Sequence, residues 1–217
     1  MKQWLIEQGE NISTKELQLP PEQVAMKYAN QCKPAIENIK PSRVPEKMQS
    51  TGRQYGTGNG SLKYDGQKNN RQKLIIGMVA EMIVYEKLQE DQNIENVKWV
   101  SRYAAHVEPA YSGYNPHGTD GLGYDIEYTD RTGNKNFVEV KGKADDQNCF
   151  EITIPEIEKA KQEKNFYHII FVTNTLNEEL RRIKYLGNLF MFEEGEDLLN
   201  NKRFSAVTKS YEIRFKE

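Results

Sequence analysis

Residues 123–128 read Gly-Tyr-Asp-Ile-Glu-Tyr, residues 138–141 read Val-Glu-Val-Lys, and together these two segments decide the fold. Each has the apolar alternation of a short β-strand. The polar residues 129–135 between them contain Gly133 next to Asn134, a combination typical of a hairpin turn. The sequence therefore predicts an antiparallel hairpin inside an α/β domain.

The second strand of this hairpin carries charged side chains on one face. Because side chains alternate along a strand, Glu139 and Lys141 share a face while the neighbouring valines point into a core. A turn centred near Gly133, with residues 132–134 as its loop, would set Asp125 opposite Lys141. Two carboxylates and one ammonium would suit a divalent cation held by oxygens, with a lysine beside the attacking water. The plain alternative is a solvated Glu–Lys pair on an exposed strand.

Further motifs occur in a fixed order around the hairpin. They are residues 77–81 (Gly-Met-Val-Ala-Glu), 123–126 (Gly-Tyr-Asp-Ile), 138–142 (Val-Glu-Val-Lys-Gly) and 150–153 (Phe-Glu-Ile-Thr), followed by Glu156. Their order and spacing resemble the C-terminal domain of the Protein NO VEIN family, over roughly residues 71–175. Asp125 followed by Glu139-Val140-Lys141 is also similar to the signature of the PD-(D/E)xK nuclease superfamily, although Tyr124 stands where that signature has proline.

The resemblance implies a restriction-endonuclease-like α/β core. The order of the expected strands and helices implies a mixed central sheet flanked by helices, and the patterns in residues 1–50 add an N-terminal helical appendage. It implies a metal-dependent deoxyribonuclease, the nuclease part of a defence or restriction-type system. Asp125, Glu139 and the Val140 carbonyl would hold Mg²⁺, with Mn²⁺ as a substitute. Lys141 would stabilise the transition state and help to deprotonate the attacking water. Glu81 would be the auxiliary acid, on a second cation or on a water of the first.

Glu81 lies in the middle of an apolar stretch that predicts a buried helix over residues 71–90. A carboxylate there costs free energy unless it is paired, hydrogen-bonded or bound to a metal. The alternative is a surface position on a polar stripe with Lys73 and Gln89. Gly77, one turn earlier, would let the helix approach the sheet closely.

Thr153 and Glu156 have the spacing of a capping box, with Pro155 in the first turn of a helix over residues 155–164. The functional alternative is that one of them orients Lys141 or contacts a phosphate. A third strand is predicted over residues 150–154 and a fully buried one over 167–173. Weaker strand patterns occur near residues 182–186, 189–192 and 211–215.

Composition divides the chain into a helical segment (residues 1–50), a Gly/Asn-rich linker (51–70) and the nuclease-like domain (71–217). Helices are predicted over residues 3–10 and 21–39. The apolar face of the second helix could form a homodimer interface or pack on its own core. The linker includes Arg53, Lys63 and Lys68, which could bind the DNA backbone; the alternative is a passive tether.

The 217 residues have a formal net charge of −2, which excludes a uniformly basic nucleic-acid-binding surface but allows a local basic track. Two cysteines are too few for a disulfide framework, so we expect a reducing, cytoplasmic location. No signal peptide or membrane segment is expected, and no nucleotide-binding motif is present, so any ATPase or helicase would be a partner chain. Two other classes stay open: a catalytically inactive DNA-binding or dimerisation module of a larger assembly, and a protein-interaction adaptor.

Overall fold

The computed structural model describes residues 12–31, 34–39, 66–106 and 117–206. The helices are α2 (Pro21–Ala29), α3 (Gly66–Glu90) and α4 (Ile154–Glu163), and short 3₁₀ turns are η1 (Glu16–Gln18), η3 (Arg102–His106), η4 (Asp120–Leu122) and η5 (Lys164–Phe166). The strands are β1 (Ile36–Asn38), β2 (Ile94–Trp99), β3 (Ile126–Asp130), β4 (Lys135–Gly142), β5 (Tyr167–Thr173) and β6 (Arg182–Gly187).

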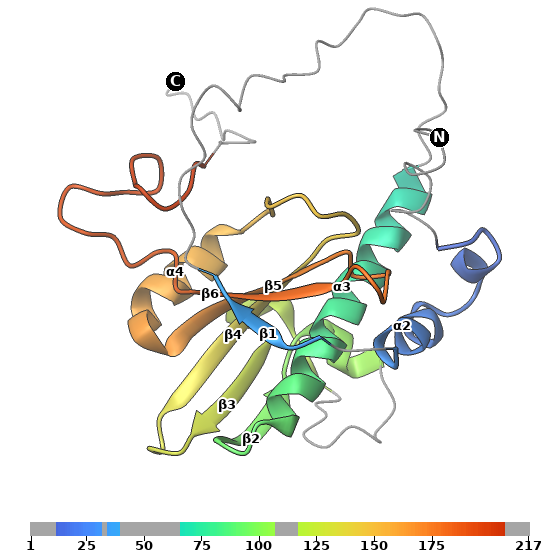
Figure 1. Cartoon of the computed structure of the whole chain (residues 1–217), viewed down its shortest axis with the longest axis horizontal. Helices are drawn as coiled ribbons and strands as arrows, with labels where there is room; N and C mark the ends of the chain where they lie inside the picture. Colours follow the sequence, from blue (N-terminus) through green and yellow to red (C-terminus); the bar gives the residue numbers. More distant parts are fainter. Residues whose placement is uncertain (1–11, 32–33, 40–65, 107–116, 207–217) are drawn as a thin grey trace, which may run out of the picture.

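The strands form one six-stranded sheet in the order β1-β6-β5-β4-β3-β2 (Figure 1). β4 pairs in parallel with β5, and β1 in parallel with β6, while the other neighbours are antiparallel. The fold is therefore α/β with a mixed sheet, which confirms the predicted class and is consistent with a restriction-endonuclease-like core.

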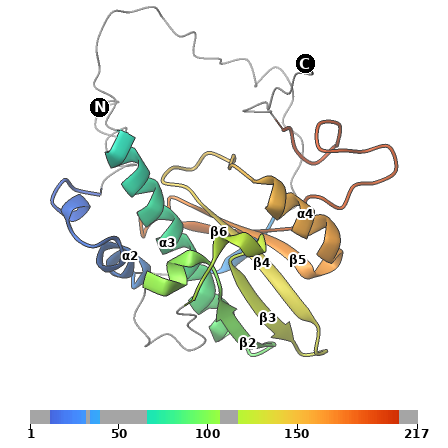
Figure 2. The ribbon, with the colours of Figure 1, turned by 180° about the vertical axis from the view of Figure 1, so that it is seen from behind.

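Helices cover both faces of the sheet, as Figures 1 and 2 show from opposite sides. On one face, α3 packs its apolar side chains on Ile126, Val138 and Ile170, and α2 packs outside it in the same core. On the other face, α4 and the segment after β6 cover a smaller core around Phe137 and Tyr167. Of the helices in the described part of the chain, none is both long and apolar enough to cross a membrane.

The two central strands are buried on both sides, which explains their continuous apolar sequence. All seven residues of β5 are buried, and its bounds are those predicted from the sequence. In β4, Val138 and Val140 point into the α3 core as expected. The predicted hairpin is formed by β3 and β4.

The N-terminal part of the chain joins the main sheet and core. The helix predicted over residues 21–39 ends at Ala29, and residues 36–38 form strand β1 instead. The apolar face of α2 packs in the α3 core of its own chain, and homodimerisation itself stays a prediction. Residues 66–70 of the predicted linker form the start of α3. The rest of the linker and the helix over residues 3–10 lie outside the described residues.

Two predicted strands are wrong. Residues 150–153 form no strand, and Ile154, which is 70% exposed, already begins α4. Residues 189–192 form no strand; Leu189 and Phe190 instead pack on the α4 side of the sheet. The strand near 211–215 lies outside the described residues.

The close approach between α3 and the sheet occurs at Gly142, where a Cβ atom would lie 2.8 Å from the Ala80 Cβ and 3.0 Å from the Ile76 carbonyl oxygen. The sequence pointed to Gly77 for this role. A Cβ at Gly77 would instead meet the ring of Tyr103 in η3 at 3.1 Å. The contact at Gly142 fixes the helix directly against the end of β4.

Candidate active site

The end of β4 places Glu139 and Lys141 on the face covered by α4. Glu139 is only 3% exposed, because its strand is central in the sheet and pairs with β5 beside Ile169. Lys141 Nζ lies 2.7 Å from Glu139 Oε1 and 2.8 Å from Glu156 Oε2. The exposed-strand alternative for this pair is therefore wrong. The structure has a largely buried cluster of one ammonium and several carboxylates.

Lys141 is held as a cation. Burial by itself would lower the pKa of the Lys141 ammonium, but the charges of Glu139 and Glu156 outweigh it and raise the pKa above its usual value. Lys141 therefore carries its positive charge at any physiological pH.

Asp125, which directly precedes β3, completes the cluster. Its Oδ2 accepts a hydrogen bond of 2.8 Å from the Val140 backbone N–H, and its own N–H donates to the Val138 carbonyl at 2.9 Å. Asp125 therefore lies beside residues 138–140 and on the same face as Glu139. The sequence predicted that Asp125 would lie opposite Lys141, and this prediction is wrong.

The hairpin loop explains this shift in register. Thr129 pairs with Lys135, so the loop is centred one residue earlier than predicted, with Gly133 at φ 81° in the left-handed region. Asp130 fixes the loop, because its Oδ1 accepts hydrogen bonds from the Thr132 and Asn134 N–H groups at 2.9 and 3.0 Å. Moving the centre by one residue moves each cross-strand partner by two, which preserves the face on which Asp125 lies.

Glu156 links the cluster to helix α4. The capping box with Thr153 is present, and Glu156 Oε2 accepts the Thr153 N–H at 2.9 Å. The same oxygen accepts Lys141 Nζ. The two sequence interpretations of Glu156 therefore hold together: it caps the helix and it orients the lysine. Thr153 is the N-cap residue of this capping box at the start of α4.

Glu81 is buried at 4% exposure, which excludes the surface position on a polar stripe. Its Oε2 accepts hydrogen bonds from Trp99 Nε1, at 2.7 Å, and from the Ser101 hydroxyl. Burial raises the pKa of Glu81 to about 8, even though both hydrogen bonds oppose this. Trp99 and Ser101 were missed in the sequence, although the alternation of Val97, Lys98 and Trp99 was a signal for the strand that carries them.

The acids of the cluster repel one another. Burial and the charge of Glu81 raise the pKa of Asp125, and burial and the charge of Asp125 raise the pKa of Glu139, both well above their usual values. Lys141 is paired with Glu139 and Glu156, so negative charge is in excess when these two residues, Asp125 and Glu81 are all ionised. An additional cation would relieve this repulsion.

Within the described ranges, no three His, Cys, Asp or Glu side chains are gathered so as to hold a metal ion. Asp125 and Glu139 are the side chains that could hold one, together with backbone oxygen. Val140 is the backbone candidate: since its N–H points to Asp125, its carbonyl leaves the strand on the same side.

Three basic residues were also predicted to contact the DNA backbone. Arg53 and Lys63 lie outside the described residues. Lys68 belongs to the first turns of α3. A DNA-binding role for these three basic residues stays a prediction.

The fold and the cluster define an α/β protein with a buried acid–lysine site at the end of a central strand. Residues 80–186 match the family model described as Protein NO VEIN, C-terminal, which confirms the resemblance over that segment. The matched segment contains Glu81, Asp125, Glu139, Lys141 and Glu156. No curated protein and no solved structure matches the chain. Membership of the PD-(D/E)xK superfamily is not tested by this match and stays a prediction.

Proposed function

We propose that the protein is a metal-dependent nuclease that hydrolyses DNA phosphodiester bonds, as the nuclease part of a defence or restriction-type system. The observation that carries the proposal is the buried Lys141 ammonium, fixed by Glu139 and Glu156 next to Asp125. A carboxylate pair beside a fixed cation at a strand end suits the handling of a phosphate and a metal ion in one place.

Mg²⁺ fits the oxygens that this site offers, and Mn²⁺ would substitute for it. Mg²⁺ is usually bound through one or two carboxylates and keeps several waters, so a site with fewer than three acidic ligands is sufficient. Asp125, Glu139 and the Val140 carbonyl would hold the ion. When bound, it supplies an activated water and offsets negative charge on the phosphate.

Lys141 contributes positive charge to the transition state. Because its pKa is raised, it stays protonated, and we assign it the stabilisation of charge on a phosphate oxygen rather than the removal of a proton from water. Glu156 holds this ammonium in place from α4. Glu81, whose pKa is raised to about 8, is the auxiliary acid, and its charge acts on Asp125.

The test is cleavage of supercoiled, linear and single-stranded DNA, and of RNA, by the full chain in Mg²⁺, Mn²⁺ or EDTA. We expect metal-dependent cleavage of DNA. Asp125→Ala, Glu139→Ala and Lys141→Ala should each lower the rate about a hundredfold or more. Glu127→Gln is the matched control, because Glu127 lies on the same face of β3 but bonds to Tyr124 and Lys135 instead.

A wild-type cleavage rate in any of the three alanine variants would contradict the assignment of this cluster as the active site. Binding to DNA without cleavage in any metal would instead support a catalytically inactive DNA-binding module. Thermal unfolding with added Mn²⁺ gives an independent readout: the ion should raise the melting temperature of the wild type and of Glu127→Gln, but not of Asp125→Ala.

A further inference from the structure

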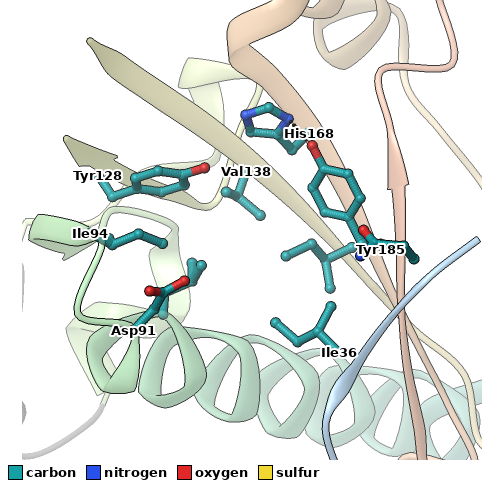
Figure 3. Close-up of a pocket in the computed structure, with 10 residues that line it drawn as sticks. Ile36, Asp91, Ile94, Tyr128, Val138, His168 and Tyr185 are labelled. Carbon is teal, nitrogen blue, oxygen red and sulfur yellow. Dashed lines mark hydrogen bonds between the residues drawn. The ribbon is translucent and has the colours of Figure 1, made fainter. Parts of the chain in front are cut away.

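A pocket of about 230 Å³ lies on the α3 face of the sheet, away from the acid–lysine cluster (Figure 3). Val138 lines the pocket and Glu139, the next residue, belongs to the cluster on the other face, so the two sites lie on opposite sides of β4. The lining residues are Ile36, Asn38, Leu88, Asp91, Ile94, Tyr128, Val138, His168, Ile170 and Tyr185. The proposed nuclease chemistry uses none of them.

A chain of hydrogen bonds fixes the protons at one wall of this pocket. The Asn136 amide nitrogen donates to Asp130 Oδ2 at 3.3 Å and to the Asn134 carbonyl at 3.0 Å, which sets the orientation of the amide. Asn136 Oδ1 therefore faces His168 Nε2, at 2.9 Å, and must accept its proton. His168 is neutral, since burial lowers its pKa to about 4.

The consequence reaches Tyr185. With the proton of His168 on Nε2, its Nδ1 is an acceptor, so the Tyr185 hydroxyl at 2.7 Å must donate to it. The hydroxyl proton of Tyr185 is then committed to His168. What the Tyr185 oxygen can offer a ligand is a lone pair, not a proton.

Asp91 supplies a second acceptor at the exposed rim of the pocket. Its Oδ1 accepts the backbone N–H and the side-chain amide of Asn93, both at 2.8 Å. Its Oδ2 makes no hydrogen bond to the residues that the structure describes. Figure 3 shows Asp91 on the side of the space away from His168 and the Tyr185 hydroxyl. A ligand between them would meet acceptors at both ends.

The walls suit a flat ring. Tyr128 and His168 are nearly parallel, at 17° with centroids 6.3 Å apart, and His168 and Tyr185 are 5.5 Å apart. Figure 3 shows Ile94 beside Tyr128, and Ile36 across the space from Tyr128 and His168. The volume is below the ~300–1,000 Å³ of pockets for drug-sized ligands, so the occupant is one ring or two fused rings.

We propose that this pocket binds a flat heteroaromatic ring with an exocyclic N–H donor, of the size of a nucleobase. The apolar side chains and the aromatic rings contact the faces of the ligand. The Tyr185 oxygen and the Asp91 carboxylate accept its N–H groups. At these two positions an acceptor on the ring edge is disfavoured, because it would leave the lone pairs of Tyr185 and Asp91 unpaired or facing its own.

The test is an NMR titration of the full-length, isotope-labelled chain with adenine, and with purine as the ligand that lacks the exocyclic amine. We expect weak binding of adenine, with shifts at His168 and Tyr185, and binding of purine roughly three- to tenfold weaker. Tyr185→Phe and Asp91→Asn should each weaken the binding of adenine by a similar factor. Tyr124→Phe, which removes a hydroxyl on the other face of the sheet, is the matched control and should bind as wild type.

Equal affinities for adenine and purine, or shifts outside the pocket, would overturn the proposal. So would wild-type affinity in Asp91→Asn, a rim position where folding is not at risk. Displacement of adenine by a single-stranded oligo(dA) would identify a base in a strand as the source of the ring. Failure of the oligonucleotide to compete would identify a free small molecule, and either result supports the pocket as a site. The titration needs no cleavage, so its outcome is independent of the nuclease assay.

Discussion

Replacing Glu81 with glutamine isolates the effect of one buried carboxyl group on stability. Glu81 accepts hydrogen bonds from Trp99 and Ser101, and a glutamine amide oxygen can accept from the same two donors. The substitution therefore removes the ionisation and keeps the volume. Any change in pH dependence then reports the titration of Glu81 and of Asp125, whose pKa the charge of Glu81 raises.

The sign follows from the direction of the shift. The pKa of Glu81 is raised from 4.5 to about 8 in the folded protein, so the folded state binds more protons than the unfolded state between these values. The stabilisation is complete below about pH 4.5 and is lost as the pH rises through about 8. At about 1.36 kcal/mol per pH unit, the loss amounts to at most about 5 kcal/mol.

The assay is urea unfolding of the full chain in EDTA at pH 5, 7 and 9. The free energy of unfolding of the wild type should fall by several kcal/mol across this range, and that of Glu81→Gln by less, because burial still raises the pKa values of Asp125 and Glu139 in the variant. Asp125 becomes easier to ionise in the variant, because the charge of Glu81 raises its pKa, and this flattens the curve further. Glu90→Gln, at the exposed end of α3, should follow the wild type. Parallel curves for wild type and Glu81→Gln would refute a buried, titrating Glu81.

Three further substitutions test other contacts. Gly142→Ala should lower the free energy of unfolding in urea by about 1–3 kcal/mol, because the added Cβ would overlap Ala80 in α3. Gly121→Ala is the control, because a Cβ at that position meets only ordinary contacts. Asp130 has its pKa lowered to about 2 by bonds within the hairpin loop, so the wild type loses stability as the pH falls from about 4 to 2. In thermal unfolding, the melting temperature of Asp130→Asn should not show this loss at low pH. A melting temperature that falls with pH as steeply as that of the wild type would contradict the prediction. Glu156→Gln keeps the helix cap but loses the ion pair with Lys141. The value of kcat should therefore fall, with little change in KM or in the melting temperature. An unchanged kcat would mean that Glu156 only caps the helix.

The central part of the fold was predictable because burial on both faces leaves a clear pattern. β5 could be predicted with its bounds from its continuous apolar run, and the start of α4 from its capping box. β1 has only three residues and pairs with a strand almost 150 positions later, so no local pattern indicates it. Residues 150–153 alternate like a strand, but alternation alone does not supply a pairing partner.

The site was predictable in its members but not in its contacts. Asp125, Glu139, Lys141 and Glu156 do come together, because strand periodicity and the capping box fix their faces. The position of Asp125 along β4 was predicted wrongly, since the side chain of Asp130 selects an earlier loop than the Gly-Asn pair suggests.

The place of β1 at the edge of the sheet has a consequence for how the protein can be cut. β1 pairs with residues 183–185 of β6, and Ile39 N–H extends the ladder to the Tyr185 carbonyl at 3.0 Å. A fragment beginning at α3 would leave this row of β6 backbone groups unpaired, a template for strand addition between molecules. The matched segment, residues 80–186, would also lack the first turns of α3. Self-association of such fragments would therefore report an exposed sheet edge, and not the assembly of the intact chain.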